Sequence, residues 1–427
     1  MNLNQTLQEK YPHLEVSVFS YSKVKEHLIF GSEFNSNTRE NAIQSIVSNK
    51  NVNDYFELIN TNVSTLKEFI YIYDLTHSLG NFMIDVEPTQ EIGSNKKEAI
   101  KGDFVISRLR SYLKEMAVIQ SKNFKQLLST EYLVYRPKTN LLSSNTLLAF
   151  SLSRIVQTIL NYSQYGTEHP RFYEFVFNEM PIPKCLLLMN AEIDSIMNKA
   201  YEVLEQSKIF YKKAEETLYL ELGLDPKNPL QSLLDSKTNI PTNSLNISIR
   251  TLKESFLKTG RLDSEYYQSK YEDIEKFIKS YPNGYDSFSN IINNKDTNFT
   301  PKNNENYSYI ELANIGNNGN ISEPISDLGK NLPTRARRIV SKGDVIISSI
   351  EGSLSSCALI TQEFDKHLVS TGFFVLNSKL LNGETLLVMF KSQIFQEYLK
   401  KFPSGTILCA INKEELSKIL IPKIDST

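Results

Sequence analysis

The sequence predicts an α+β protein in which two similar mixed α/β domains are joined by a long coiled-coil-type helix. Three observations lead to this prediction. The second half of the chain repeats the first, a helical segment with a heptad-like apolar pattern lies between the copies, and 427 residues exceed what one hydrophobic core normally holds. We therefore expect a first domain over residues 1–188, a spacer helix over 189–224 and a second domain over 225–427.

The repeat is clearest around a Lys-Gly-Asp motif in each half. KGDFVISRLRSYLKEMAVIQ at 101–120 aligns without a gap with KGDVIISSIEGSLSSCALIT at 342–361, and the alignment continues to STEYLV at 129–134 opposite STGFFV at 370–375. After a two-residue slip, three further pairs follow: 146–148 with 385–387, 166–167 with 405–406, and 182–184 with 421–423. Because Gly, Asp, Thr and Pro keep their places over such a stretch, we infer that one domain was duplicated within the chain.

Each copy has the pattern of a β-rich domain. The Gly-Asp pair predicts a turn, and the apolar run after it predicts a buried strand. We expect strands at 69–75, 104–106, 117–119 and 129–134 in the first copy, and at 307–312, 345–347, 358–360 and 370–375 in the second. The segment 147–160 is apolar but interrupted by Ser, Arg and Gln, so it predicts one buried amphipathic helix.

A loop of equal length follows the KGD strand in each copy, at 107–114 and at 348–355. Its flanking strands are kept, whereas its side chains differ: Arg108 and Arg110 in the first copy correspond to Ser349 and Glu351 in the second. A recognition surface that diverged after duplication would produce this pattern. An unselected loop that drifts freely would produce it too.

The Gly-Thr pairs at 166–167 and 405–406 predict a turn that leads into a short helix. Threonine is a common N-cap, and the backbone amides of a helix start are able to hold an anion such as phosphate. An ordinary helix start without a ligand fits the same residues equally well.

A long helix is predicted between the copies over Asn190–Leu222, with Gly223 in the position of a C-terminal cap. Apolar and small side chains recur along it at alternating spacings of three and four, which indicates a coiled-coil seam. The seam residues are Ile193, Ile196, Ala200, Val203, Ser207, Phe210, Ala214 and Thr217. With a rise of about 1.5 Å per residue the helix extends roughly 50 Å, more than one turn of B-DNA. The seam predicts a partner helix.

Composition argues against several classes of protein. Three widely spaced cysteines and five scattered histidines show neither CxxC nor HExxH spacing, so we expect no metal site and no disulfide framework. The motifs of amino-methyltransferases, phosphate loops, dinucleotide-binding folds and serine hydrolases are also missing from the sequence, so we expect no catalytic residue and no cofactor in this chain. With no long apolar stretch and no signal-like N-terminus, a cytoplasmic location without membrane contact is expected.

The overall charge of −2 argues mildly against a nucleic-acid partner, but its distribution argues for one. Basic residues gather at equivalent places in both copies, around the first KGD motif and before the second. These residues are Lys96, Lys97, Lys101, Arg108, Arg110 and Lys114 in the first copy, and Lys330, Arg335, Arg337, Arg338 and Lys342 in the second. A solvated charged face would explain either cluster alone, whereas recurrence at the same place favours a binding surface.

These motifs together resemble the specificity subunits of type I restriction-modification enzymes. The resemblance is carried by ARRIVSKGDVIIS, VSTGFFVL, SGT and IPK in the second copy, by IKGDFVIS, LSTEYLVY, YGT and PIPK in the first, and by the helix between them. It covers nearly the whole chain. No single motif is diagnostic, but their order and duplication are specific.

The resemblance implies two target-recognition domains, each recognising one half of a split site in double-stranded DNA, and a helix that docks methyltransferase subunits. It also implies a non-catalytic chain, with S-adenosylmethionine bound by the methyltransferase, and ATP and magnesium used by a restriction-motor subunit. Beside the basic residues above, the DNA-binding role then falls on Thr167, Arg171, Ser349, Glu351 and Thr406, with Arg171 expected to contact phosphate.

One feature departs from the family pattern, which ends with a second long helix packed antiparallel on the central one. The sequence stops at 421–427, where that helix would begin. We expect either a truncated chain or a central helix that pairs with another chain, which includes a homodimer. A coiled-coil scaffold that does not bind DNA and carries duplicated protein-interaction domains is the alternative function.

Overall fold

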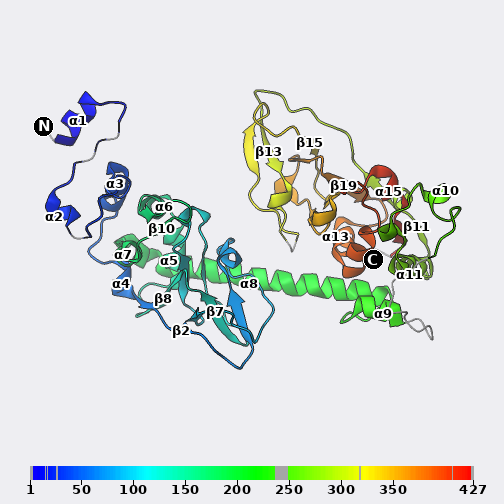
Figure 1. Cartoon of the computed structure of the whole chain (residues 1–427), viewed down its shortest axis with the longest axis horizontal. Coiled ribbons are helices and arrows are strands. Elements are labelled where there is room, and N and C mark those ends of the chain that lie inside the picture. The colour runs from blue at the N-terminus through cyan, green and yellow to red at the C-terminus, as the bar shows by residue number, and fades with distance from the viewer. Residues whose placement is uncertain are drawn as a thin grey trace. The chain divides into compact units, whose positions relative to one another are not determined.

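The computed structural model describes residues 3–14, 16, 18–25, 27–235, 249–316, 319–405 and 407–424. The chain forms two compact units, Met1–Leu204 and Glu205–Thr427, called unit 1 and unit 2 below. Both combine sheets and helices, and the long helix α8 (Lys184–Glu221) contributes residues to each (Figure 1). The expected mixed α/β class with a long helix is therefore confirmed. The domain limits at 188/189 and 224/225 remain a prediction, because the boundary between the units falls inside α8.

The first sheet of unit 1 is antiparallel and buried on both faces. Its strands, in spatial order, are β1 (Phe56–Ile59), β8 (Tyr132–Pro137), β5 (Phe104–Ser107) and β6 (Met116–Val118). Successive side chains of β5 point to opposite faces, as strand geometry requires. Phe104 and Ile106 join a core made with the helices, and Val105 joins a second core made with the neighbouring sheet.

The second sheet of unit 1 mixes parallel and antiparallel pairs. Its order is β2 (Asn62–Val63), β4 (Lys96–Ala99), β7 (Lys125–Ser129) and β3 (Ile70–Tyr73), with β3 and β7 parallel. The strand expected at 129–134 is in fact two strands, since β7 ends at Ser129 and β8 begins at Tyr132 in the other sheet. The single-strand prediction is wrong because one apolar run supplies both sheets, with the turn at Thr130 and Glu131 between them.

The helices of unit 1 are α1 (Leu3–Lys10), α2 (Tyr21–Val24), α3 (Asn37–Gln44), α4 (Val52–Tyr55), α5 (Ser144–Ser151), α6 (Arg154–Asn161) and α7 (Glu174–Asn178). Helices α3 to α7 contribute side chains to the core on one face of the first sheet, whereas α1 and α2 have no buried residues. The single helix expected over 147–160 is wrong. Ser153 divides the segment, because its hydroxyl accepts a hydrogen bond from the Val156 amide and starts α6 as an N-cap.

Unit 2 repeats this arrangement. Its first sheet is β12 (Ile292–Asn294), β19 (Phe373–Ser378), β16 (Val345–Ser348) and β17 (Cys357–Leu359), and its second is β14 (Ile325–Leu328), β13 (Asn306–Ile310), β18 (Leu368–Ser370) and β15 (Ala336–Ile339). A two-stranded sheet of β11 (Tyr285–Ser287) and β20 (Leu420–Pro422) completes it. Its helices are α9 (Pro229–Asp235), α10 (Phe256–Thr259), α11 (Ser269–Lys279), α12 (Phe288–Ile291), α13 (Gly383–Lys391), α14 (Gln393–Leu399) and α15 (Lys413–Lys418).

Equivalent elements occupy equivalent places in the two units. The order β1-β8-β5-β6 corresponds strand by strand to β12-β19-β16-β17. In the second sheets, β4, β7 and β3 correspond to β15, β18 and β13, again with one parallel pair. The fourth strand differs, since β2 adjoins β4 in unit 1 whereas β14 adjoins β13 in unit 2. The internal repeat inferred from the sequence is therefore confirmed at the level of the fold.

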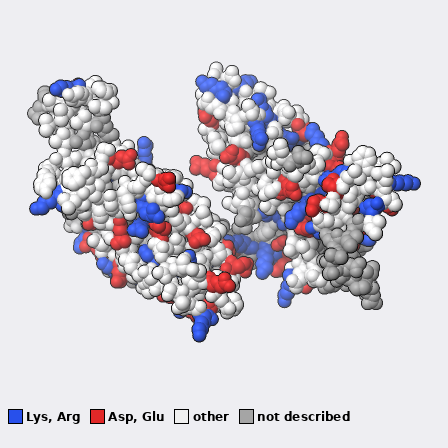
Figure 2. Space-filling view, in the orientation of Figure 1, with Lys and Arg blue, Asp and Glu red and all other residues white. Residues whose placement is uncertain are grey.

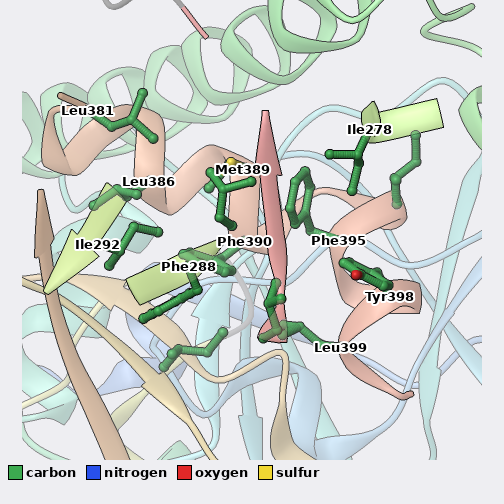
Figure 3. Close-up of a cluster of buried hydrophobic side chains, with 14 of the residues drawn as sticks. Ile278, Phe288, Ile292, Leu381, Leu386, Met389, Phe390, Phe395, Tyr398 and Leu399 are labelled. Carbon is green, nitrogen blue, oxygen red and sulfur yellow. The ribbon is translucent and has the colours of Figure 1, made fainter. Parts of the chain in front are cut away.

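The main core of unit 2 lies between its first sheet and helices α11 to α14 (Figure 3). Met389 and Phe390 of α13 and Phe395 of α14 meet there, with the rings of Phe390 and Phe395 6.1 Å apart and edge to face. Large aromatic side chains in this arrangement stabilise a core by both buried area and ring geometry. The core holds the sheet that carries the KGD strand.

Helix α8 packs at its two ends, and between them most of its residues are exposed. Leu186, Leu187 and Met197 lie against the core of unit 1, and Leu218 and Tyr219 belong to the core of unit 2. The helix ends at Glu221 and is followed by Gly223 at φ +74°, as expected of a C-terminal cap. Among the described residues, no helix is long and apolar enough to cross a membrane.

Candidate nucleic-acid interface

The KGD motif fixes the start of the buried strand in each unit. Gly102 and Gly343 have φ values of +89° and +88°, which glycine adopts at little cost. The next residue, Asp103 or Asp344, is buried, and its carboxylate accepts a hydrogen bond from a backbone amide three residues earlier, at 2.9 Å from Ile100 and 2.8 Å from Ser341. The aspartates are therefore structural and are not exposed to DNA.

Each of these aspartates is neutralised by a cation. Arg136 donates two hydrogen bonds to Asp103, at 2.9 and 2.8 Å, and Lys295 donates one to Asp344, at 2.7 Å. Hydrogen bonding to Asp103 raises the pKa of the Arg136 guanidinium above its usual value. Such pairing is needed because an isolated buried carboxylate is costly.

In unit 1 the loop after β5 is joined to a hairpin made of β9 (Gln164–Tyr165) and β10 (Arg171–Phe172). The Arg110 amide donates to the Pro170 carbonyl at 2.8 Å, and the Phe172 amide donates to the Arg108 carbonyl at 3.2 Å. Leu109 and Arg171 thus form an antiparallel bridge.

Unit 2 builds the same frame from the loop after β16. The Glu351 amide donates to the Cys409 carbonyl at 3.0 Å, and the Ile411 amide donates to the Ser349 carbonyl at 2.8 Å. Ile350 and Ala410 form the corresponding bridge. We call each combination of KGD loop and hairpin a recognition frame; the residues are 107–114 with 164–172, and 348–355 with 404–411.

The structure corrects the prediction for the Gly-Thr pairs. Gly166 turns the hairpin at φ +86° and Thr167 is exposed in its loop, whereas the next helix, α7, starts at Glu174 with Tyr173 as N-cap. The helix start expected at Thr167 is therefore wrong, because its amides belong to a hairpin turn. In unit 2, Gly405 has φ +132°. Thr406 lies outside the described residues.

Three charged side chains meet on the frame of unit 1. The Arg171 guanidinium donates to the two carboxylate oxygens of Glu131 at 3.0 and 2.6 Å, and Arg108 Nη2 lies 3.8 Å from Glu131 Oε2. The Arg171 hydrogen bonds lower the pKa of Glu131 below its usual value. We call these three residues the Glu131 cluster.

The other basic residues expected in unit 1 differ in their exposure. Lys101 and Lys114 are exposed, Lys96 is half-buried beside Ser94, and Arg110 lies 3.1 Å from the His169 ring. Lys97 is not available for DNA as placed, because it is buried and its ammonium donates to the Tyr132 carbonyl at 2.9 Å. Arg110 and Lys114 have left-handed φ values of +49° and +54°, and strain of this kind in non-glycine residues is common at functional sites.

The basic residues expected in unit 2 also differ in their exposure. Lys330, Arg335 and Lys342 are exposed, Arg337 is half-buried, and Arg338 donates to the Phe373 carbonyl. This hydrogen bond holds the Arg338 side chain against the sheet, and burial there lowers the pKa of its guanidinium. On the face seen in Figure 2, basic side chains alternate with acidic ones in both units, so neither unit shows a uniformly basic surface there.

The two polar residues expected to contact bases in unit 2 are placed differently. The Ser349 hydroxyl donates to the Gly372 carbonyl at 2.9 Å, whereas Glu351 is exposed. Sequence reasoning missed Glu131 and the buried Glu115. The alignment of the repeats contained a signal for Glu131, since it is opposite Gly372 where the frame is otherwise kept.

The described residues include no group of three or more His, Cys, Asp or Glu side chains that could hold a metal ion. The three cysteines, Cys185, Cys357 and Cys409, are free. Burial raises the pKa of the Cys357 thiol to about 12, which keeps it protonated and unreactive.

Comparisons with known proteins agree with the repeat motifs. No protein-family model matches the chain. The type I restriction enzyme HindI specificity subunit of Haemophilus influenzae is 30% identical over 124 residues, which are 29% of this chain and 26% of that protein. The matched stretch therefore spans about a quarter of that relative.

Three solved structures are also similar. The S subunit of a type I restriction-modification system from M. genitalium is 13% identical, with 89% of this chain and 86% of that chain covered and a TM-score of 0.41. The HsdS subunit from Thermoanaerobacter tengcongensis is 15% identical, with 88% and 84% covered and a TM-score of 0.26. A chain solved in work on complex assembly and conformational transition of a type I R-M system is 16% identical, with 87% and 84% covered and a TM-score of 0.29. The sequence match agrees with the resemblance inferred from the repeat motifs: over 29% of its length, the chain is similar to a type I restriction enzyme specificity subunit.

Proposed function

We propose that this chain is a sequence-specific DNA-binding subunit in which each unit recognises one half of a bipartite site. It would direct methyltransferase and restriction subunits to that site without catalysing a reaction itself. S-adenosylmethionine, ATP and Mg²⁺ would then bind to those partners.

The observation that carries the proposal is the twofold occurrence of one recognition frame with different side chains. The backbone hydrogen bonds at 108–110 and 170–172 recur at 349–351 and 409–411, while Arg108, Arg110 and Arg171 are replaced by Ser349, Glu351 and Ala410. A protein that must recognise two different half-sites needs this combination of a constant frame and variable contacts. The sequence similarity to the HindI specificity subunit supports the same function.

The chemistry of the frames suits DNA. Exposed Lys101 and Lys114 in unit 1, and Lys330, Arg335 and Lys342 in unit 2, are able to neutralise phosphates, and polar side chains of the loops are able to contact base edges in the major groove. We place the phosphate contacts on these exposed cations and the base contacts on the loops.

The exposed seam of α8 supports a protein partner. Ile196, Val203 and Phe210 are spaced by seven residues and are 61%, 52% and 67% exposed, which leaves the a/d-type stripe of the helix without a cover among the described residues. Apolar stripes of this kind bind helices of other chains or segments. We assign this stripe to docking of the methyltransferase subunits or of a second helix. Because the stripe would serve a scaffold equally, a protein scaffold that does not bind DNA is the second candidate function.

Methylation mapping of host DNA, with and without the gene, tests the proposal. A split methylated sequence that disappears on deletion of the gene is expected. If the methylated sequences were the same in both strains, and the purified complex bound DNA weakly at every salt concentration, the scaffold would be favoured.

Charge reversal tests the phosphate contacts. The variants Arg335→Glu and Lys342→Glu are preferable to a change of Arg338, whose side chain is needed inside the fold. Each lost phosphate contact should lower the salt dependence of binding by about one unit of log–log slope. Lys253→Glu and Lys258→Glu, which change exposed cations outside the frames, are the matched controls and should leave the slope unchanged.

A further inference from the structure

The Glu131 cluster has the geometry of a prearranged donor pair. Glu131 lies in the turn between β7 and β8, Arg108 follows β5, and Arg171 is on β10, so three separate segments bring the side chains together. All three are half-buried, with side-chain exposures of 25% for Glu131, 28% for Arg108 and 31% for Arg171. A guanidinium held on one edge by a carboxylate keeps a fixed orientation, whereas a free surface arginine does not.

Both arginines retain donors for a ligand. Arg171 uses Nε, Nη1 and Nη2 once each, on Glu131 and on the His169 carbonyl, out of about five donors that a guanidinium offers. Arg108 Nη2 has only the 3.8 Å contact with Glu131, and because its Nε is buried without a hydrogen-bond partner among the described residues, the Nη groups are the ones able to reach a ligand. Arg171, oriented by two hydrogen bonds, and Arg108, held by an ion pair alone, thus keep unused Nη donors at the recognition frame.

Charge decides between a phosphate and a base as the ligand. The hydrogen bonds with Arg171 lower the pKa of Glu131, so its carboxylate is ionised at neutral pH. A carboxylate beside the arginines weakens their attraction for an anionic phosphate, since its charge opposes theirs. It does not repel the neutral edge of a base. The base that accepts two hydrogen bonds from arginine in the major groove is guanine, through O6 and N7.

Unit 2 lacks the cluster, because its counterparts are Gly372 for Glu131, Ser349 for Arg108 and Ala410 for Arg171. There the Ser349 hydroxyl donates to the Gly372 carbonyl at 2.9 Å. The backbone frame of unit 2 therefore forms without the cluster, so the frame itself does not require these three side chains.

We propose that Glu131 is a specificity-determining positioning residue that holds Arg171 and Arg108 to bind a guanine in the half-site recognised by unit 1. This assignment rests on the proposed function. It replaces the expectation that Arg171 contacts phosphate.

The test uses the full chain in its assembled methyltransferase complex. Glu131→Gln, Arg171→Lys and the control Glu68→Gln are compared by methylation mapping in cells and by binding of duplexes that carry each base at every position of the mapped site. Glu68 forms an exposed ion pair with Lys125 in the same unit, so its change removes a carboxylate and an ion pair without touching the frame.

Arg171→Lys should lose discrimination at one guanine of the unit 1 half-site by roughly 5- to 150-fold, while non-specific binding stays constant because the charge is kept. Glu131→Gln should lose discrimination at the same position but bind all duplexes more tightly at low salt, because a repulsive charge has been removed. The half-site of unit 2 and the Glu68→Gln variant should be unchanged. A merely structural role for Glu131 would lower binding to all sequences and leave the discrimination at that position intact.

The inference is overturned if Glu131→Gln and Arg171→Lys keep the wild-type base preference, or if both change affinity equally for every sequence, as phosphate contacts would. Unfolding curves of each variant show whether a loss comes from unfolding, and the charge-preserving Arg171→Lys keeps the test decisive if Glu131→Gln unfolds. If the wild-type complex bound no split site, the proposed function would fail as well. If wild-type binds such a site and the variants keep its preferences, only the role of Glu131 fails.

Discussion

The recognition frames of units 1 and 2 have the same backbone and few side chains in common. The amide of Arg108 donates to the Glu131 carbonyl at 3.0 Å, and the amide of Ser349 donates to the Gly372 carbonyl at 2.9 Å, although the four side chains differ completely. The backbone bonds and the buried strand fix the loop, so the loop side chains are free to change. The comparison therefore separates residues that hold the frame from residues that contact a ligand.

The residues that hold the two frames have the same function even where the residue types differ. Asp103 and Asp344 occupy the same buried position, yet the first is neutralised by Arg136 of β8 and the second by Lys295, which follows β12. A buried carboxylate needs a cation, and the cation comes from the adjacent strand β8 in unit 1 but from the end of β12, two strands away from β16, in unit 2. The two copies therefore share the buried aspartate but differ in the residue that neutralises it.

The largest expected effect comes from removing these aspartates. Asp103→Ala and Asp344→Ala should each destabilise their own unit by about 2–4 kcal/mol, because a partly buried cation loses its partner and a turn amide loses its acceptor. Chemical denaturation of the full chain, followed by hydrogen exchange to assign the loss to a unit, measures the effect. If replacing one aspartate did not lower the free energy of unfolding, the two positions would not be equivalent, and the two units could not be compared at this residue.

The next largest effect is expected at the hairpin glycines, where replacement by alanine should destabilise the two units by different amounts. A Cβ on Gly405 would lie 2.6 Å from the Leu408 carbonyl oxygen, whereas a Cβ on Gly166 would lie 3.4 Å from the His169 carbonyl oxygen. Gly405→Ala should therefore cost about 2–3 kcal/mol, and Gly166→Ala about 1 kcal/mol, which is the cost of a left-handed φ alone.

Gly102→Ala and Gly343→Ala are the controls for this prediction. Both glycines have nearly the same positive φ and open space at the Cβ position, so both variants should cost about 1 kcal/mol. Equal losses at Gly166 and Gly405 in the same thermal or chemical unfolding measurement would contradict the steric argument.

The sequence predicted the duplicated frame well because the frame depends on local rules. A Gly-Asp turn followed by an apolar run specifies a buried strand in both units, and strands β5 and β16 were expected to within one residue. The long helix was expected for the same reason, since its heptad pattern and Gly223 are local signals.

The errors arose where tertiary contacts decide. The apolar run at 129–134 is shared between two sheets, and Ser153 starts a second helix inside an apolar stretch. Exposure of a charge is also a tertiary property: Lys97 and Arg338 are basic residues next to the motif, but their side chains bond to backbone carbonyls. The pairing of Glu131 with Arg171 joins residues 40 positions apart, which no local pattern in a single sequence reveals.

A smaller difference between the two frames is expected in the pH dependence of their stability. Arg171 lowers the pKa of Glu131 below its usual value, so the folded state holds this carboxylate ionised more strongly than the unfolded state does. The stability that it contributes is present above the unfolded pKa and is lost as the pH falls through the folded pKa. For a pair about one-third exposed, the contribution is about 1 kcal/mol or less.

Unit 2 has Gly372 at this position, so the effect should be confined to unit 1. Unfolding of wild-type and Glu131→Gln chains between neutral and acidic pH measures it, with the difference between them shrinking as the pH falls. A difference that grew on acidification would have the wrong sign and would reject the pairing.

The smallest expected effect has the opposite sign and involves Glu115, which corresponds to Ser356 in unit 2. Glu115 is 5% exposed, its Oε2 has no hydrogen-bond partner among the described residues, and burial raises its pKa. Its backbone role is ordinary, since the carbonyls of Glu115 and Ser356 each accept from a strand amide at 2.9 Å. The ionised side chain therefore destabilises unit 1, whereas unit 2 has the uncharged Ser356 at this position.

Glu115→Gln should therefore stabilise unit 1 at neutral pH by less than about 1 kcal/mol, because the amide keeps the shape of the side chain and avoids burial of a charge. The raised folded pKa means that the wild-type carboxylate binds a proton more readily in the folded state. Stability from this group is greatest at low pH and declines as the pH rises from the unfolded to the folded pKa, so the gain of the variant should vanish on acidification. Glu91→Gln, at an exposed position of the same unit, should show no such trend. A variant that is less stable than wild-type at neutral pH would mean that the Glu115 charge is used, and Glu115 would then join Glu131 as a residue selected in unit 1 for its ligand and not for its fold.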